Sequence, residues 1–403
     1  MQVKVNKGII ASYLIALGIV YNTMNGTLSS ASTLISLSFI LVLLLFINQI
    51  YNGNIKRQYF PILFFSIFLV FTNVTLSGGG GFDYYKKAIM YSTTIVWMVY
   101  CVNQSLSKNT VILVLIINIA INILYLVFFR RGFSMYEGEL LLTLNFPNPN
   151  QTGMFLLNSI LYICIPIVSG MDLLGKRTQY WVVIGLLIPL LISVSNLLIM
   201  TGTRSSFMSL ALFAFLVFID YVSNGHFKLK KWMAFIVSIM PFVFVFIYLS
   251  YVGDLSSDIS MGIENAGKSN TTRVPIWKPI VDNFAHYFII GDYYGISNGT
   301  GMSQLHNTHL DVYASYGIIP LILYVRLLYM IIVQSIRKSC CRFQRVSLYA
   351  FISCMVSCIF EASLVAGSAG MFLLTVGFLA MANSPISHTD SPIVRERKFI
   401  IVS

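Results

Sequence analysis

The chain has 403 residues, of which 57% are hydrophobic and only 10% are charged. Charged residues make up about a quarter of an ordinary soluble domain, so this composition excludes a soluble globular protein and indicates an integral membrane protein. The net charge of +12 is not accompanied by any basic segment interleaved with aromatic residues, so we expect no nucleic-acid partner. We attribute the excess to membrane topology and to contact with membrane lipid.

Twelve apolar segments are long enough to cross about 30 Å of hydrocarbon. The first begins near the N-terminus without a small-residue cleavage site behind it, so we interpret it as a retained helix. We expect an all-α polytopic membrane protein with about twelve transmembrane helices, in which residues 1–403 form a single membrane domain. The predicted spans are residues 8–25, 31–50, 60–76, 88–102, 110–129, 152–169, 181–200, 206–222, 232–251, 312–334, 347–365 and 368–384.

Most of the 26 Lys and Arg residues fall in every second loop, on the same side of the membrane as the N-terminus. Cytoplasmic loops of membrane proteins carry the excess of basic residues. The distribution therefore predicts cytoplasmic N- and C-termini. The six cysteines suggest no disulfide framework, and we interpret them as small apolar filler.

Three segments on the predicted outer side are more polar than the other loops, and loops commonly carry function. They are residues 77–87, residues 130–153 and the longest one, residues 252–311. Within the last, apolar residues recur at near-helical spacing from Val274 onward. This pattern predicts a short amphipathic helix at the outer membrane surface.

Arg204 lies in "TGTRSS", where the seventh predicted span ends at the outer interface. An arginine at this depth is costly unless it snorkels or pairs with an anion. It is therefore either an interface anchor or a ligand for phosphate oxygens, which the guanidinium fork matches in a bidentate manner.

Arg273 opens the amphipathic segment in "NTTRVPIW", with Lys278 about one turn later. The two charges are either solvated loop residues or part of a binding site. Two arginines brought together on the outer face, Arg204 and Arg273, would match a lipid diphosphate headgroup.

His306 and His309 stand three residues apart in "LHNTHLD". A zinc site would need further ligands, and the spacing fits no zinc signature, so we expect no metal. Asn307 is a candidate helix cap. A histidine in an outer cleft could instead take a proton from a sugar hydroxyl, because the imidazole titrates near neutral pH. If a metal were bound beside these histidines, its additional ligands would come from His286, Asp292 and Asp311.

Glu361 lies within the eleventh predicted span, toward its outer end. An acid at such depth is a functional-site hypothesis by default. Its expected partner is Arg204 or Arg273, in an ion pair that is either structural or catalytic. The asparagines of "NFPNPNQTG", together with Asp83, Glu137 and Glu139, are weaker candidates for hydrogen bonds to sugar.

Four motifs together resemble the O-antigen ligase/polymerase superfamily of bacterial inner-membrane proteins. "TGTRSSFMSLALF" resembles its arginine-containing span end, and "LHNTHLDVYASYGIIPLILY" its H-N-x-x-L pattern after the large periplasmic loop. "NTTRVPIWKPIVDNFAHYFIIGDYYG" is similar to the block between them, and "NFPNPNQTG" to its N-x-N segment. The resemblance covers about residues 140–385.

The resemblance implies a metal-independent, inverting glycosyltransferase with a GT-C-like fold, no cofactor, and a site on the periplasmic or external face of the inner membrane. Its substrates would be glycans linked to undecaprenyl diphosphate, as donor and as acceptor. On this chain, Arg204 and Arg273 would hold the diphosphate and His306 would be the base. Glu361, Lys278, His309 and Asn307 would have supporting roles at most.

The superfamily includes polymerases and ligases, and the shared donor site does not separate them. We favour a polymerase of O-antigen or capsular polysaccharide, for which the resemblance also implies a chain-length regulator as partner. One reason is that the ligase-like "S-R-G" sequence after the seventh span reads "TRSS" in this chain. A ligase that transfers the chain to lipid A-core stays open. So does a polysaccharide flippase, although such transporters usually show two related halves and none is visible.

Overall fold

The computed structural model describes residues 10, 28–53, 55–77, 82–104, 106–129, 132–136, 139–144, 146, 149–255, 273–292, 305–361 and 371–384. Most of these residues are helical, which confirms an all-α polytopic architecture. Seven of the described helices are long and apolar enough to cross a membrane. The first predicted span lies outside the described residues apart from Ile10. The count of twelve and the orientation remain predictions.

The long helices follow the predicted spans closely because each is a continuous apolar run ended by polar or glycine-containing turns. Gly175 and Gly225, for example, follow two of them with φ of 70° and 77°, a conformation that glycine adopts without a Cβ penalty. The helices are α2 (Leu28–Tyr51), α3 (Tyr59–Leu76), α4 (Phe82–Asn103), α5 (Lys108–Phe129), α6 (Pro149–Leu174), α7 (Arg177–Met200), α8 (Arg204–Val222), α9 (Lys231–Leu255), α15 (Ile318–Lys338), α16 (Arg342–Phe360) and α17 (Met371–Ala382).

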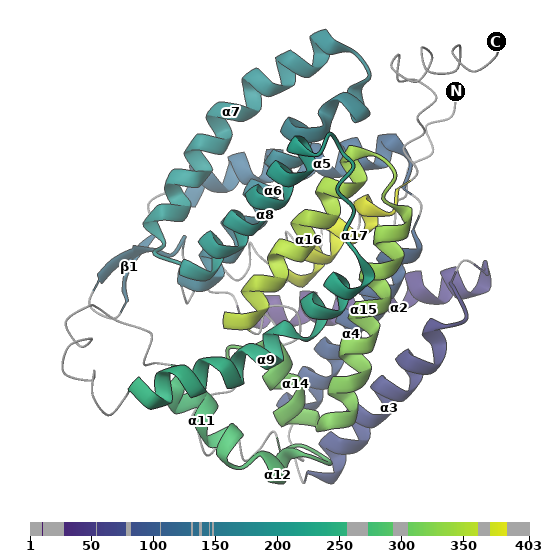
Figure 1. Cartoon of the computed structure of the whole chain (residues 1–403), viewed down its shortest axis with the longest axis vertical. Coiled ribbons are helices and arrows are strands. Elements are labelled where there is room, and N and C mark those ends of the chain that lie inside the picture. The colour runs from purple at the N-terminus through teal and green to yellow at the C-terminus, as the bar shows by residue number, and fades with distance from the viewer. Residues whose placement is uncertain are drawn as a thin grey trace.

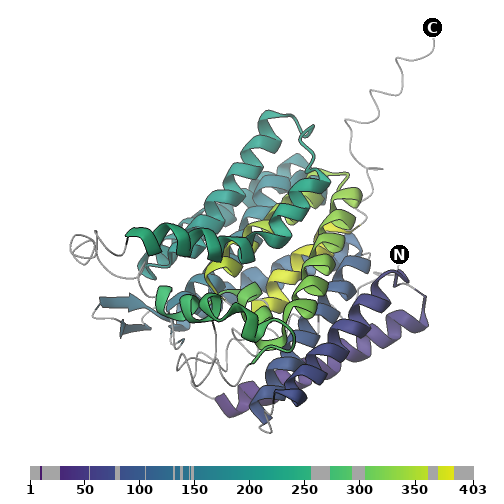
Figure 2. The ribbon, with the colours of Figure 1, turned by 60° about the horizontal axis from the view of Figure 1, so that its bottom comes forward.

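Helix α16 is the centre of the bundle. It packs against α6, α8, α9 and α17, and Figure 1 shows it between α8 and α15. Figures 1 and 2 place α7 and α3 on opposite sides of the bundle. Peripheral helices expose large apolar side chains, such as Phe64 and Phe68 of α3 and Leu186 of α7. This is the pattern expected of surfaces that face lipid.

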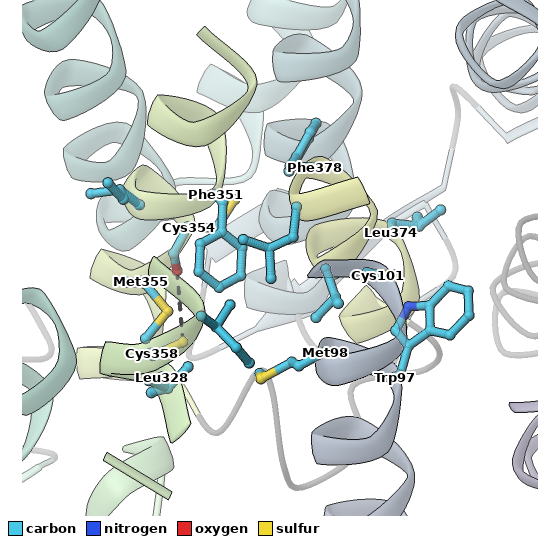
Figure 3. Packing of buried hydrophobic residues seen from close by; sticks show 14 of the residues in the cluster. Trp97, Met98, Cys101, Leu328, Phe351, Cys354, Met355, Cys358, Leu374 and Phe378 are labelled. Carbon is cyan, nitrogen blue, oxygen red and sulfur yellow. Dashed lines mark hydrogen bonds between the residues drawn. The ribbon is translucent and has the colours of Figure 1, made fainter. Parts of the chain in front are cut away.

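Figure 3 shows part of the core beside α16, with labelled side chains from α4, α15, α16 and α17. Cys101 of α4 and Cys354 and Cys358 of α16 are buried among them, and all six cysteines of the chain are free thiols. The interpretation of the cysteines as small apolar filler is confirmed for these three. The other labelled members are Trp97, Met98, Leu328, Phe351, Met355, Leu374 and Phe378.

The predicted span 312–334 is not continuous, and this prediction was wrong. Helix α14 (Thr308–Tyr316) ends at Gly317, and α15 starts directly after it. Gly317 has a φ of 89°, which glycine reaches without a steric penalty and which breaks the helix. A hydrophobicity count does not detect the break, because the segment as a whole stays apolar enough for a span.

The amphipathic segment is confirmed as α11 (Val274–Asp282), which buries Ile276, Trp277 and Ile280. It packs against α9, beneath which it lies in Figure 1, and leads to the short α12 (Phe284–Tyr287). The following chain covers the break at Gly317, because Ile318 N donates to Phe288 O at 2.9 Å and Asp292 N to Ala314 O at 2.8 Å.

A short hairpin precedes α6, and the sequence analysis did not predict it. Strands β1 (Phe133–Tyr136) and β2 (Glu139–Leu142) pair antiparallel, with Phe133 opposite Leu142. Thr152 donates its hydroxyl to Thr143 O, so the hairpin is attached to the first turn of α6.

Candidate active site

The side chain of Glu361, directly after α16, joins three other segments of the chain. Its Oε1 accepts hydrogen bonds from Asn150 Nδ2 at 2.8 Å and Arg273 Nη2 at 3.1 Å. Its Oε2 lies 3.0 Å from His306 Nδ1. The side chains of Glu361, Arg273 and His306 are 11%, 18% and 19% exposed. We call these four residues the Glu361 cluster.

The C-terminal end of α16 fixes the position of this cluster. The last carbonyls of a helix have no partner within the helix, and here incoming side chains supply the donors. Asn307 Nδ2 donates to Ile359 O at 2.9 Å, Arg273 Nη2 to Phe360 O at 3.0 Å and Thr308 Oγ1 to Glu361 O at 3.0 Å. The positive charge of Arg273 also suits the negative end of the helix dipole.

His306 is held in place by its chain neighbours. Asn307 is the N-cap of α14, and its side chain accepts from Leu310 N at 2.9 Å, which confirms the capping prediction. On the other side, the carbonyl of Leu305 accepts from the buried Trp277 Nε1 at 2.7 Å. His306 itself has a φ of 51°, a conformation that is uncommon for residues other than glycine.

The contact with Glu361 selects how the imidazole can act. A carboxylate beside Nδ1 favours the tautomer that carries a hydrogen on that nitrogen. Nε2 then has a lone pair, and among the described residues it has no hydrogen-bond partner. The arrangement matches a base held by a carboxylate, in which the carboxylate orients the ring and stabilises its protonated form.

His309 serves a different purpose from His306. It is fully buried, its Nε2 lies 2.8 Å from Ser238 O, and its ring meets the edge of Tyr324. Burial lowers its pKa to about 4, so the ring is neutral near pH 7 and Nε2 donates to the carbonyl. No hydrogen bond joins His309 to the Glu361 cluster.

His309 and Asn307 together hold α14 against the part of α9 that contains Pro241. Pro241 lies inside α9, and a proline there removes a helical hydrogen bond and displaces the preceding turn. Asn307 Nδ2 donates to Pro241 O at 2.7 Å, beside the bond from His309 to Ser238 O. These contacts give the two residues structural roles.

Arg204 is the first residue of α8 and not the last of the preceding span, as the sequence had suggested. The turn before it contains Gly202, whose φ is 64°. Thr203 Oγ1 donates to Pro149 O at 3.2 Å, which places the start of α8 against the start of α6, next to Asn150. Arg204 is exposed there, at the same end of the bundle as Glu361.

The other predicted residues lie apart from the cluster. Lys278 is exposed on α11, and His286 pairs with Asp292 at 3.0 Å on the surface. Asp83 and Glu137 have no described side chain. Within the described part of the chain, no three His, Cys, Asp or Glu residues gather as metal ligands would.

Asn150 was underrated by the sequence analysis. It was one of several asparagines in "NFPNPNQTG", none with a stronger claim than the others. The structure selects it because Pro149 begins α6, a position that suits proline, and the next side chain then faces Glu361. The sequence shows several asparagines in this segment, but it does not show which of them lies at the start of α6 facing Glu361.

Two apolar hollows lie elsewhere. One, of about 610 Å³, is lined by α3, and the other, of about 620 Å³, lies between α9 and α15. Neither is lined by a residue of the Glu361 cluster, so neither hollow defines the site.

The fold and the cluster define a multi-span membrane protein in which a histidine, a carboxylate and an arginine are gathered at one end of a helical bundle, with Arg204 exposed at the same end. Residues 188–325 match the family described as O-antigen ligase. This match supports the O-antigen ligase/polymerase superfamily, whose members are glycosyltransferase-like enzymes acting on lipid-linked glycans. The match includes Arg204, Arg273 and His306, whereas Asn150 and Glu361 lie outside it. No curated protein and no solved structure matches the chain significantly.

Proposed function

We propose that the protein is a polysaccharide polymerase of the bacterial plasma membrane, working at the outer face. It would transfer a glycan chain from undecaprenyl diphosphate to the terminal sugar hydroxyl of an incoming lipid-linked repeat unit. The observation that carries the proposal is the 3.0 Å contact between Glu361 Oε2 and His306 Nδ1, with Arg273 on the other carboxylate oxygen. This contact gives the chain a base beside a cation.

In the proposed reaction, Nε2 of His306 takes the proton of the acceptor hydroxyl as its oxygen attacks the anomeric carbon of the donor. A new glycosidic bond forms and the bond from that carbon to the diphosphate oxygen breaks. Undecaprenyl diphosphate leaves with the electron pair. Attack from the opposite face inverts the anomeric carbon. Glu361 stabilises the imidazolium during the step, as the carboxylate of a catalytic triad does.

The arginines would stabilise the charge that builds on the leaving diphosphate. Nη2 of Arg273 already bonds to Phe360 O and Glu361 Oε1. A guanidinium has five N–H donors, and the described residues offer no hydrogen-bond partner to Nε and Nη1 of Arg273, so these groups would bind phosphate oxygens. Arg204 adds a second charge at the N-terminus of α8, where the helix dipole also favours an anion.

A ligase is the second candidate, because the matched family is described as O-antigen ligase. Such an enzyme would use the same donor site and base but would transfer the finished chain to lipid A-core. The two functions differ only in the acceptor. The acceptor is therefore the variable to change in the experiment.

The test is a transfer assay with the purified protein and native lipid-linked repeat units as the sole substrate. A ladder of longer glycans is expected, and EDTA should leave it unchanged. His306→Gln, Arg204→Ala and Arg273→Ala should abolish or strongly reduce the ladder. Arg177→Ala, an exposed arginine at the start of α7, and His226→Gln, an exposed histidine after α8, are matched controls that should retain it.

Each other outcome has a defined meaning. If products form only after lipid A-core is added, the protein is a ligase. Full activity in His306→Gln would reject the proposed base, and loss of activity in EDTA would reject the metal-independent reaction.

A further inference from the structure

A buried ion pair joins α4 to α14, next to the loop that carries His306. Lys87 Nζ lies 2.8 Å from Asp311 Oδ1 and 3.2 Å from Ser315 Oγ. The side chains of Lys87 and Asp311 are 7% and 0% exposed. The sequence analysis had placed Lys87 in an outer loop and had considered Asp311 only as a metal ligand.

This pair is poorly arranged for stability alone. Removing two charges from water carries a desolvation penalty, which their attraction offsets only when the remaining polar atoms are also satisfied. The second oxygen of Asp311, Oδ2, is buried without a hydrogen-bond partner. The arrangement therefore suggests a role in placing neighbouring groups.

The neighbouring group is Leu305, the residue before His306. Leu305 N donates to the same Asp311 oxygen that binds Lys87, at 3.4 Å, and Leu305 O accepts from Trp277. Both backbone polar groups of Leu305 are thus held by side chains, one from α14 and one from α11.

The conformation of His306 makes such restraint necessary. Its φ of 51° is unfavourable for a residue with a Cβ and persists only when the surroundings impose it. Asn307 and Thr308 fix the chain after His306 on the end of α16. The bonds to Leu305 fix the chain before it.

We propose that Lys87 and Asp311 are positioning residues, which hold Leu305 so that the His306 ring meets Glu361. The effect on transfer rests on the proposed function, but the placement of the ring does not. Lys87 fixes the Asp311 carboxylate, the carboxylate fixes Leu305 N, and the chain then presents Nδ1 of His306 to Glu361 Oε2.

The decisive variant replaces both charges by apolar side chains, Lys87→Met with Asp311→Leu, because such a replacement leaves no unpaired buried charge. Its matched control is Arg345→Met with Asp220→Leu. That control removes another buried pair, in which Arg345 Nε lies 2.7 Å from Asp220 Oδ1, at the opposite end of α16. Asp311→Asn serves as a milder variant if the double variant does not fold.

Three measurements separate positioning from stability: the ¹³Cε1 signal of His306 in ¹³C-histidine-labelled protein, the thermal unfolding midpoint, and kcat and KM for lipid-linked repeat units. His306→Gln identifies the signal among those of the five histidines. We expect the Lys87/Asp311 variant to move the His306 signal and lower kcat by up to about 100-fold, with little change in KM. The control pair should leave both unchanged, even where the midpoint falls.

An unmoved His306 signal in both the Lys87/Asp311 variant and Asp311→Asn would overturn the inference. If His306→Gln retains transfer while the signal moves in these variants, the positioning role stands and the proposed base is wrong. The two failures are therefore distinguishable.

Discussion

Glu361 Oε2 lies 3.0 Å from His306 Nδ1, while Oε1 of the same carboxylate accepts from Arg273 and Asn150. One side chain thus connects the end of α16 to the start of α6, the start of α11 and the loop before α14. Asn150, Arg273 and Nδ1 of His306 all present donors to this carboxylate and need an acceptor there. This demand explains why an acid is tolerated in an otherwise apolar part of the chain.

We expect Glu361→Gln to reduce glycan transfer by about 100-fold or more, the range of a lost acid–base contribution. The amide has one acceptor oxygen and one donor nitrogen. The nitrogen must face either Arg273 and Asn150, which are donors, or Nδ1 of His306. Facing Nδ1 would favour the tautomer that blocks Nε2. The measurement is kcat at saturating lipid-linked substrate, compared with thermal unfolding in detergent.

Asp282→Asn is the control for Glu361→Gln, because Asp282 is exposed at the end of α11. It should keep wild-type kcat. Equal rates in Glu361→Gln and wild type would contradict a role for the carboxylate in transfer.

Asn150 gives a test in which charge and size can be separated. Asn150→Ala removes one donor to Glu361 and should reduce activity moderately. Asn150→Asp retains the size but sets a second carboxylate against the first, and like charges in contact are destabilising. We therefore expect Asn150→Asp to be the more impaired, in both transfer and thermal stability. The reverse order would mean that Asn150 acts through its volume.

Much of the fold could be predicted from the sequence because apolar run length is a direct consequence of membrane thickness. The described long helices, from α2 to α17, follow the predicted spans. The break at Gly317 could not be predicted in this way, since the apolar run of residues 312–334 is long enough for a span whether or not the helix breaks at the glycine. Its cause is tertiary, because the chain around Phe288 and Asp292 packs onto the break and takes up its backbone groups.

The sequence indicated which residues form the site, but not which of them contact one another. His306, Arg273 and Glu361 stood out because charged or titratable side chains are scarce and costly in this chain. The pairing of Arg273 with Glu361 was one of two expected alternatives. The contact between Glu361 and His306, and the choice of Asn150, depend on how loops far apart in sequence meet. Helical periodicity carries no information about that.

Gly317→Ala should destabilise the protein strongly. Its φ of 89° disfavours any residue with a Cβ, and an added Cβ would also collide with the carbonyl of Ile289. Gly175→Ala isolates the first effect, because Gly175 has a φ of 70° and open space around the Cβ position. We expect about 1 kcal/mol for Gly175→Ala and a clearly larger loss for Gly317→Ala, measured as the shift in unfolding midpoint. Similar losses would indicate that the chain around Ile289 gives way easily.

His309 should make the stability of the protein depend on pH below neutrality. Burial lowers its pKa from 6.5 to about 4 in the folded protein, so the unfolded chain binds a proton at higher pH than the folded chain does. Stability from the neutral ring is fully present above pH 6.5 and is lost as the pH falls from 6.5 to about 4. A shift of this size corresponds to about 3 kcal/mol.

The expected result is an unfolding midpoint that falls across this window in the wild type and falls less in His309→Gln, which lacks the titrating ring. The glutamine amide can still donate a hydrogen bond toward Ser238 O, so the variant should fold at neutral pH with a modest loss of stability. His226→Gln removes an exposed histidine and should keep the wild-type pH dependence, which shows that the effect requires burial. If His309→Gln and wild type lose stability in parallel between pH 6.5 and 4, other groups control the acid sensitivity, and the buried neutral ring does not.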